Sequence, residues 1–228
     1  EHSKDSNVGD LKEFYHFGQE IPTHLKSQFN YHENVHVAEV PEFSEYGLKA
    51  YAALQTTGKY MLRAIAIYLG LEETYFDQHI AYGNSILRPI HYGPIIDAPK
   101  NAVRAGQHED INLITLLMGA SAAGLEVLDK QDNWIPITAL PNQLVVNVGD
   151  MLQRLSNNKL RSTTHRVVNP PKEEWGSTRF SIPFFLHPVS EMRLDCLEEC
   201  ITEDNSKAYE DISAGEFLTQ RLIEIGLL

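Results

Sequence analysis

Cysteine is scarce in this chain, and so is positive charge. Cys196 and Cys200 are the only cysteines among 228 residues. So few thiols exclude the class of small, disulfide-dense secreted domains, and we expect two reduced thiols in a cytoplasmic protein. The net charge is −12, which argues against a nucleic-acid partner held by a broad basic surface.

Long apolar runs are also missing. No stretch is apolar for long enough to cross a bilayer, so we expect no membrane partner. Phosphate-binding loops, H-E-x-x-H motifs and internal repeats are absent from the sequence as well. What is present is an ordinary globular composition, 43% hydrophobic and 22% charged, in a chain long enough for one sizeable core. We expect a monomer or weak homo-oligomer that acts on a small molecule.

The most informative stretch carries a histidine and a carboxylate two positions apart, at His108 and Asp110. In an extended backbone these side chains point to the same face, while Glu109 points away. One imidazole and one carboxylate supply two ligands of a 2-His-1-carboxylate metal site. His165 is the best candidate for the third, because it lies in another strand-like run with β-branched neighbours. An isolated H-x-D pair is a weak signal, however, and among ten histidines a chance partner is easy to find.

A second pair, Arg179 and Ser181, raises the specificity of the pattern. The two side chains alternate onto one face of a predicted strand. A guanidinium beside a hydroxyl is suited to binding a carboxylate, although a surface salt bridge is the alternative for the arginine. Phe185 shares this face and could wall a pocket, but a core position is favoured. His91 and His187 have no carboxylate at a useful spacing, so we expect both to be structural.

Helices are expected at both ends of the chain. Apolar residues recur at period 3.6 over residues 45–69, with a stop at Gly70, and a shorter helix is expected over 72–79. Ser213 and Glu216 have the spacing of a capping box, which predicts a carboxy-terminal helix. The apolar face of that helix comprises Leu218, Leu222 and Ile225.

The middle of the chain consists of short β-type runs separated by turn signals. Asp132-Asn133 and Asn157-Asn158 are predicted hairpin turns. Many short strands at close spacing indicate a mainly β fold with flanking helices, and eight strands fit a jelly roll. The predicted strands are residues 85–92, 103–107, 112–117, 125–128, 134–137, 143–148, 160–168 and 179–186.

The order of H-x-D, a distant histidine and R-x-S resembles the iron(II)- and 2-oxoglutarate-dependent dioxygenases, in the branch similar to isopenicillin N synthase. The resemblance extends over residues 87–188 and implies a double-stranded β-helix core. Residues 87–94 look like the family's Arg-x-Asn-Tyr-Tyr-Pro segment, with Ile90 where many relatives have asparagine. Other matching segments are 124–127, 134–136, 147–150 and 165–167.

The resemblance also implies a chemistry. The implied iron(II) ligands are His108, Asp110 and His165. Arg179 and Ser181 would hold the distal carboxylate of 2-oxoglutarate, and Tyr92 takes the place of a tyrosine that hydrogen-bonds this co-substrate. For Tyr92, an ordinary strand aromatic is an equal alternative. O2 is the other co-substrate, ascorbate is a candidate reductant, and the implied outcome is hydroxylation, desaturation or cyclisation of a small molecule.

Two other functions stay open from the sequence. Enzymes similar to isopenicillin N synthase keep the R-x-S pair without using 2-oxoglutarate, so an oxidase is one alternative. A jelly-roll protein that binds metal without turnover is the other, although no ligand is lost. We expect one domain, with a helical flanking segment (1–81), a catalytic core (82–190) and a helical cap (191–228). Because family members usually carry an earlier segment, we also expect an N-terminal part beyond these residues.

Overall fold

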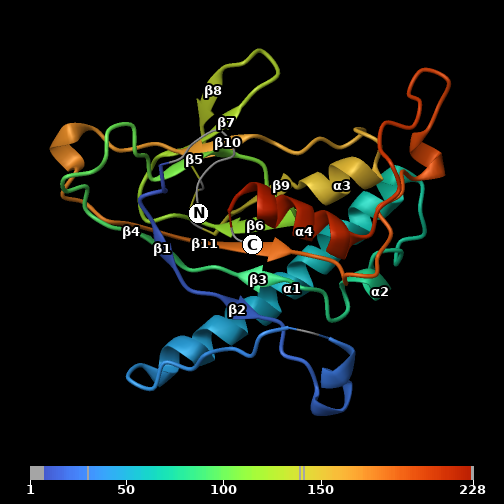
Figure 1. Cartoon of the computed structure of the whole chain (residues 1–228), viewed down its shortest axis with the longest axis horizontal. Coiled ribbons are helices and arrows are strands. Elements are labelled where there is room, and N and C mark those ends of the chain that lie inside the picture. Colours follow the sequence, from blue (N-terminus) through green and yellow to red (C-terminus); the bar gives the residue numbers. More distant parts are fainter. Residues whose placement is uncertain (1–7, 30, 139, 141, 227–228) are drawn as a thin grey trace.

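A computed structural model of the chain describes residues 8–29, 31–138, 140 and 142–226 (Figure 1). The α-helices are α1 (Pro41–Leu69), α2 (Asp77–Ile80), α3 (Asp150–Leu155) and α4 (Ala214–Glu224), and short 3-10 helices cover Thr23–Gln28, Lys172–Glu174 and Glu198–Cys200. The strands are β1 (Glu13–Phe14), β2 (Phe17–Gly18), β3 (Ile86–Leu87), β4 (Ile90–Tyr92), β5 (Ala105–His108), β6 (Ile114–Met118), β7 (Leu125–Leu128), β8 (Trp134–Pro136), β9 (Leu144–Val148), β10 (His165–Val167) and β11 (Arg179–Leu186).

Two antiparallel sheets form the centre of the described chain. In the larger, seven-stranded sheet, β11 pairs with β6 on one side and with β4 and then β3 on the other. Strand β9 continues this sheet beyond β6, while the four-stranded sheet has the order β5-β10-β7-β8. Strands that are distant in sequence therefore pair, as a jelly roll requires. The predicted mainly β architecture with flanking helices is present.

Strand β11 has two different faces because its side chains alternate. Phe184 and Leu186, which are fully buried, pack toward α1. The ring of Phe184 meets Tyr51 of that helix edge-on, with 5.0 Å between centroids. A Cβ atom at Gly58 would lie 2.7 Å from Leu186, so glycine lets the helix approach the strand. The opposite face of β11 lines a cavity.

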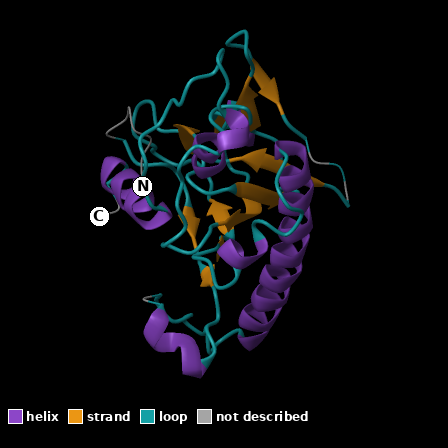
Figure 2. Ribbon diagram, turned by 90° about the vertical axis from the view of Figure 1, so that its right-hand side faces the viewer, coloured by secondary structure: helices purple, strands orange, loops and turns teal. Residues whose placement is uncertain are grey.

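The two longest helices lie on opposite sides of the strands. Figure 2 shows α1 on one side and α4 on the other, with the sheets between them. Helix α1 begins at Pro41, slightly before the predicted start, because proline is favoured in the first turn. It ends at Gly70, where φ is +85°, so the predicted stop is confirmed. The capping box that begins α4 at Ser213 is also confirmed.

Short segments are where the sequence-based prediction was wrong. The helix expected over 72–79 is a turn followed by α2 alone. Asn157 and Asn158 do not form a hairpin turn. They follow α3, a helix that was not predicted, and their positive φ values of 48° and 65° end it. One and a half helical turns are too few for periodicity to stand out.

The first 81 residues are not only helical. Strands β1 and β2 pair with β4 and β3 and so extend the larger sheet. Each has two residues, too few to show strand alternation in sequence. Residues 1–7 of this segment lie outside the described residues. The strand expected over 160–168 is also shorter, because only His165–Val167 pairs. Among the described helices, none has both the length and the apolar character needed to cross a bilayer.

Candidate metal centre and its cavity

Two histidines of the smaller sheet face each other. His108 is the last residue of β5, and strand register places it directly opposite His165 of β10. In an antiparallel pair, directly opposed residues project to the same face. The two ring centroids are accordingly only 4.4 Å apart. The pairing of β5 with β10 therefore brings together two histidines that are far apart in the sequence.

A buried carboxylate completes the group. Asp110 follows β5 in the link to the larger sheet and is 5% exposed. Its Oδ1 atom lies 4.0 Å from Nε2 of His108 and 3.7 Å from Nε2 of His165. One ligand atom from each of the three residues falls within 4.8 Å of the others. Two imidazoles and one carboxylate in this spacing suit a divalent transition metal such as iron(II).

Backbone carbonyl groups orient both imidazoles. Nδ1 of His108 lies 2.7 Å from the carbonyl oxygen of Gly106, and Nδ1 of His165 lies 2.9 Å from that of Thr163. A carbonyl only accepts, so each Nδ1 carries the proton and donates. The Nε2 atoms are then left with free lone pairs that point toward Asp110. This is the arrangement in which outer hydrogen bonds fix the tautomer of a metal-binding histidine.

Two side chains of the larger sheet fix the carboxylate. Thr115 donates its hydroxyl to Oδ2 of Asp110 at 2.6 Å, and the Asn147 amide donates to the same oxygen at 2.8 Å. Thr115 and Asn147 are direct partners across β6 and β9, so they share one face. Asn112 in turn donates to the threonine hydroxyl at 2.8 Å. Oδ1 of the aspartate thus stays available.

Electrostatics keeps these groups in the states that bind metal. Burial, assisted by the neighbouring His165 ring, lowers the pKa of His108. Burial alone would raise the pKa of Asp110. The two imidazoles and the bonds from Asn147 and Thr115 outweigh that effect, so its pKa is lowered. A neutral imidazole and an ionised carboxylate are the forms that ligate a metal.

Glu109 does not join this group. Its carboxylate instead accepts a hydrogen bond from the hydroxyl of Thr164. The sequence-based expectation that Glu109 turns away from its two neighbours agrees with this contact.

A cavity of about 540 Å³ opens beside the three ligands. From β11 it receives the alternating face that carries Arg179, Ser181, Pro183 and Phe185. Phe185, for which a core position was favoured, therefore lines the cavity, and so does His187 just beyond the strand. The face predicted from period-two alternation is the face that the structure turns inward.

One end of the cavity carries buried positive charge. Arg179 is 1% exposed, and its Nη1 atom has no hydrogen-bond partner among the described residues. Its Nε donates to the carbonyl of Ala122 at 3.1 Å. Its guanidinium carbon lies 5.0 Å from the ring centre of Tyr92, which is its direct partner across β4 and β11. The alternative of a surface salt bridge is wrong, because this arginine is buried and pairs with no described carboxylate.

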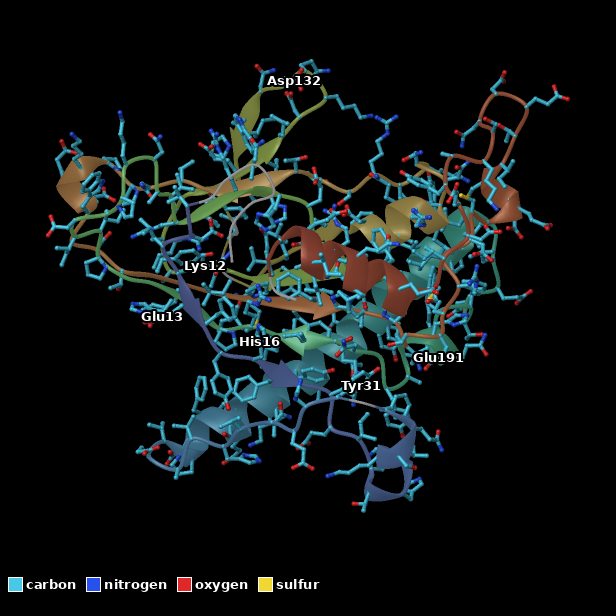
Figure 3. The ribbon with its side chains drawn as sticks, viewed as in Figure 1. Lys12, Glu13, His16, Tyr31, Asp132 and Glu191 are labelled. Carbon is cyan, nitrogen blue, oxygen red and sulfur yellow. The ribbon has the colours of Figure 1, made fainter. Side chains whose placement is uncertain are left out.

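Residues from both ends of the chain complete the walls. Lys12 lines the cavity from the N-terminal segment, where Figure 3 labels it beside Glu13. Leu218, Leu222 and Ile225 line it from α4 and the residue after it. Sequence reasoning predicted the apolar face of α4 but not what the face covers. His91, expected to be structural, binds Glu13 through Nδ1 at 2.6 Å.

Comparison with known proteins connects this geometry to one family. The model of the 2OG-Fe(II) oxygenase superfamily matches residues 83–188. A curated relative, the 2-oxoglutarate-Fe(II) type oxidoreductase hxnY of Emericella nidulans, is 31% identical over 219 residues, which is 92% of this chain and 62% of hxnY. The chain spans between 50% and 66% of the lengths of four such relatives.

Solved structures give the same picture. A protein assigned to the 2OG-Fe(II) oxygenase family from Caulobacter crescentus has 46% identity and a TM-score of 0.85, covering 99% of this chain and 73% of that one. A full-length protein from Neurospora crassa, solved in complex with alpha-KG and thymine, has 32% identity and a TM-score of 0.82, covering 95% of this chain and 66% of that one. These similarities confirm the predicted double-stranded β-helix core.

Proposed function

This chain belongs to the 2OG-Fe(II) oxygenase superfamily, and from that membership we propose that it couples oxidative decarboxylation of 2-oxoglutarate to the oxidation of a small molecule. Iron(II) is the metal, and 2-oxoglutarate and O2 are the co-substrates. When bound, these groups would supply the oxidising chemistry, while the chain supplies coordination, orientation and a cavity that limits water. Ascorbate is kept as a candidate reductant.

We propose His108, Asp110 and His165 as the three iron ligands. Three protein ligands on one face of an octahedral metal leave positions for other molecules, which is what this chemistry needs. The proposal is supported by the available Nε2 atoms of the histidines and by the free Oδ1 atom of the aspartate. Thr115 and Asn147 act through Asp110, because they hold its other oxygen.

The observation that carries the use of 2-oxoglutarate is the unpaired charge of Arg179. Burying a guanidinium without an anionic partner costs free energy, unless a bound ligand supplies the anion. Arg104, also 1% exposed, lies near enough to lower the pKa of Arg179, after the larger effect of burial. Neither arginine forms an ion pair with a carboxylate in the described chain. A buried, unpaired guanidinium on the cavity wall favours a carboxylate ligand, and 2-oxoglutarate carries one at its distal end.

In this proposal the distal carboxylate of 2-oxoglutarate pairs with Arg179. Ser181, on the same face of β11 and 4% exposed, donates its hydroxyl to the same carboxylate. Tyr92 packs against the guanidinium and holds it in place. Ile90 lies opposite Ser181 and lines the cavity. Where many relatives have the side-chain amide of an asparagine, this position therefore contributes an apolar contact.

Further properties are proposals of the same kind. A cavity of about 540 Å³ suits a small organic substrate. The Neurospora crassa protein was solved with thymine, which is of that size class. The net charge of −12 supports the absence of a nucleic-acid partner. We keep the predictions of a single catalytic domain, a monomer or weak homo-oligomer, a cytoplasmic location without a membrane partner, and a place in the isopenicillin N synthase-like branch.

Substitution of Arg179 by lysine tests the proposal. Lysine keeps the charge but loses the planar, two-pronged donor. We expect 2-oxoglutarate to bind the anaerobic iron complex about 10- to 100-fold more weakly, which corresponds to a loss of a few kcal/mol. Ser181→Ala should have a smaller effect, and iron binding should survive both changes.

The measurement is a titration of the metal-to-ligand absorption, followed by succinate formation in air. Arg193→Lys is the matched control, because Arg193 forms an exposed pair with Asp195. Equal binding by the Arg179→Lys protein would make Arg179 structural. If the parent binds iron but no 2-oxoglutarate, the oxidase alternative replaces this proposal, with Arg179 holding the carboxylate of the substrate.

A further inference from the structure

One cavity-lining side chain is buried without a partner. His187 follows the last residue of β11 and continues the alternating row that lines the cavity. It is 8% exposed, and its Nδ1 atom is fully buried without a hydrogen bond. Neither ring nitrogen bonds to any other part of the described chain. Buried polar atoms are almost always satisfied, so an orphan at a cavity wall points to a missing ligand.

The backbone around this imidazole is fixed. The amide of His187 donates to the Ser85 hydroxyl at 3.1 Å, and that hydroxyl lies 3.2 Å from the His187 carbonyl oxygen. A Cβ atom at Gly83 would lie 2.2 Å from the same carbonyl oxygen, so only glycine permits this approach. The ring is thus held beside the cavity by tight backbone packing rather than by bonds of its own.

The imidazole is uncharged at neutral pH. Burial lowers the pKa of His187 to about 4, a shift that the charge of Asp110 opposes and that of Arg88 reinforces. A neutral imidazole has one N–H donor and one nitrogen acceptor. Depending on its tautomer, the ring can therefore offer a ligand either kind of hydrogen bond, and it carries no net charge.

A carboxamide comes from the backbone segment that runs beside His187. Asn84 donates its backbone amide to the carbonyl of Pro188 at 3.3 Å, which places it beside the residue after His187. The Asn84 side chain lines the same cavity, and no hydrogen bond joins it to the described residues. An amide also offers one donor group and one acceptor. Two neutral groups that can each donate and accept thus line the same cavity from neighbouring backbone segments.

We propose that His187 and Asn84 form a subsite for the substrate that recognises an uncharged amide edge, an N–H beside a C=O as in a lactam or imide. Such an edge presents one donor, the N–H, and one acceptor, the C=O. Each of the two side chains can accept a hydrogen bond from the N–H or donate one to the C=O. A carboxylate presents acceptors only and would leave the acceptors of this subsite unsatisfied. A simple alcohol places its donor and acceptor on one atom, whereas an amide edge places them on two separate atoms, one for each side chain. The inference rests on the proposed function, since it names the substrate class of that cavity.

The test compares δ-valerolactam and glutarimide with cyclohexanecarboxylate, a carboxylate of similar size. Each is titrated calorimetrically into protein loaded anaerobically with iron(II) and 2-oxoglutarate, and into metal-free protein. We expect the parent to bind the lactam and imide at least about tenfold more tightly than the carboxylate. His187→Phe removes both ring nitrogens and should weaken lactam binding at least about tenfold. His187→Asn, which keeps a donor and an acceptor, should stay within about threefold of the parent.

Asn84→Leu is an independent second variant and should also weaken lactam binding at least about tenfold. It keeps the test decisive if His187→Phe does not fold. His36→Phe, at an exposed histidine, is the matched control. The proposal is overturned if the parent binds neither lactam nor imide, if it prefers the carboxylate, or if the Phe and Leu variants bind as the parent does. Failure of the protein to take up 2-oxoglutarate would overturn the proposed function instead, and the metal-free titration would still decide the subsite.

Discussion

Replacing Thr115 by valine tests whether the metal centre depends on the strand behind it. The threonine hydroxyl donates to Asp110 at 2.6 Å and accepts from the Asn112 amide at 2.8 Å. Valine has nearly the same shape, and Thr115 is 3% exposed, so the change removes both bonds without opening a cavity. Asn147 would remain as the only side chain of the described chain that bonds to Oδ2 of Asp110.

The expected magnitude follows from those two bonds. A hydrogen bond to a charged group contributes about 1.5–3 kcal/mol. At about 1.4 kcal/mol per tenfold, its loss should weaken iron(II) binding roughly 10- to 100-fold, as is typical when an outer partner of a metal ligand is removed. The fully buried Asn112 amide would also lose its acceptor. That loss should reduce the free energy of unfolding of the metal-free protein by about 1–3 kcal/mol.

Anaerobic calorimetry with iron(II) measures the first effect, and urea unfolding measures the second. Thr57→Val is the matched control, because this exposed hydroxyl donates only to the Ala53 carbonyl of its own helix, at 2.9 Å. It should change the free energy of unfolding by no more than about 0.5 kcal/mol. If a folded Thr115→Val protein binds iron within about threefold of the parent, Thr115 does not orient the carboxylate and the reasoning fails.

Two other changes separate the metal centre from its surroundings. Glu109→Ala should leave iron(II) affinity within about threefold by calorimetry, because its carboxylate bonds to Thr164; a loss comparable to that of Asp110→Ala would contradict the ligand assignment. Ser213→Ala should lower the free energy of unfolding by about 1 kcal/mol in urea, since it removes the hydroxyl that caps α4 through Glu216. An unchanged urea midpoint would mean that this cap contributes nothing.

The sequence predicted best where local alternation decides the geometry. His108 with Asp110, and Arg179 with Ser181, were each paired by a period of two. Local alternation does not single out His165, because register across β5 and β10 is set by the packing of whole strands rather than by either strand alone. Long helices were equally clear, since α1 spans 29 residues and shows its periodicity many times over.

The cavity walls could not be predicted in the same way. Lys12 and Leu222 reach the cavity from opposite ends of the chain, and no local signal says where a terminal segment will lie. His187 is different, because a signal for it was present. It continues the period of two that begins at Arg179, whereas the lack of a carboxylate nearby in sequence indicates only a structural role. Following the alternation one step past the strand would have placed it at the cavity.

Strand β11 also imposes an order on the cavity. At about 3.3 Å per residue, the eight positions from Arg179 to His187 correspond to roughly 26 Å of extended chain. A single small dianion at the arginine cannot reach the imidazole over that distance. The buried charge at one end and the neutral polar subsite at the other must therefore serve different ligands. Asp110 and His187 line the same cavity, so the second ligand occupies the space that the metal centre adjoins and can be the molecule that is oxidised.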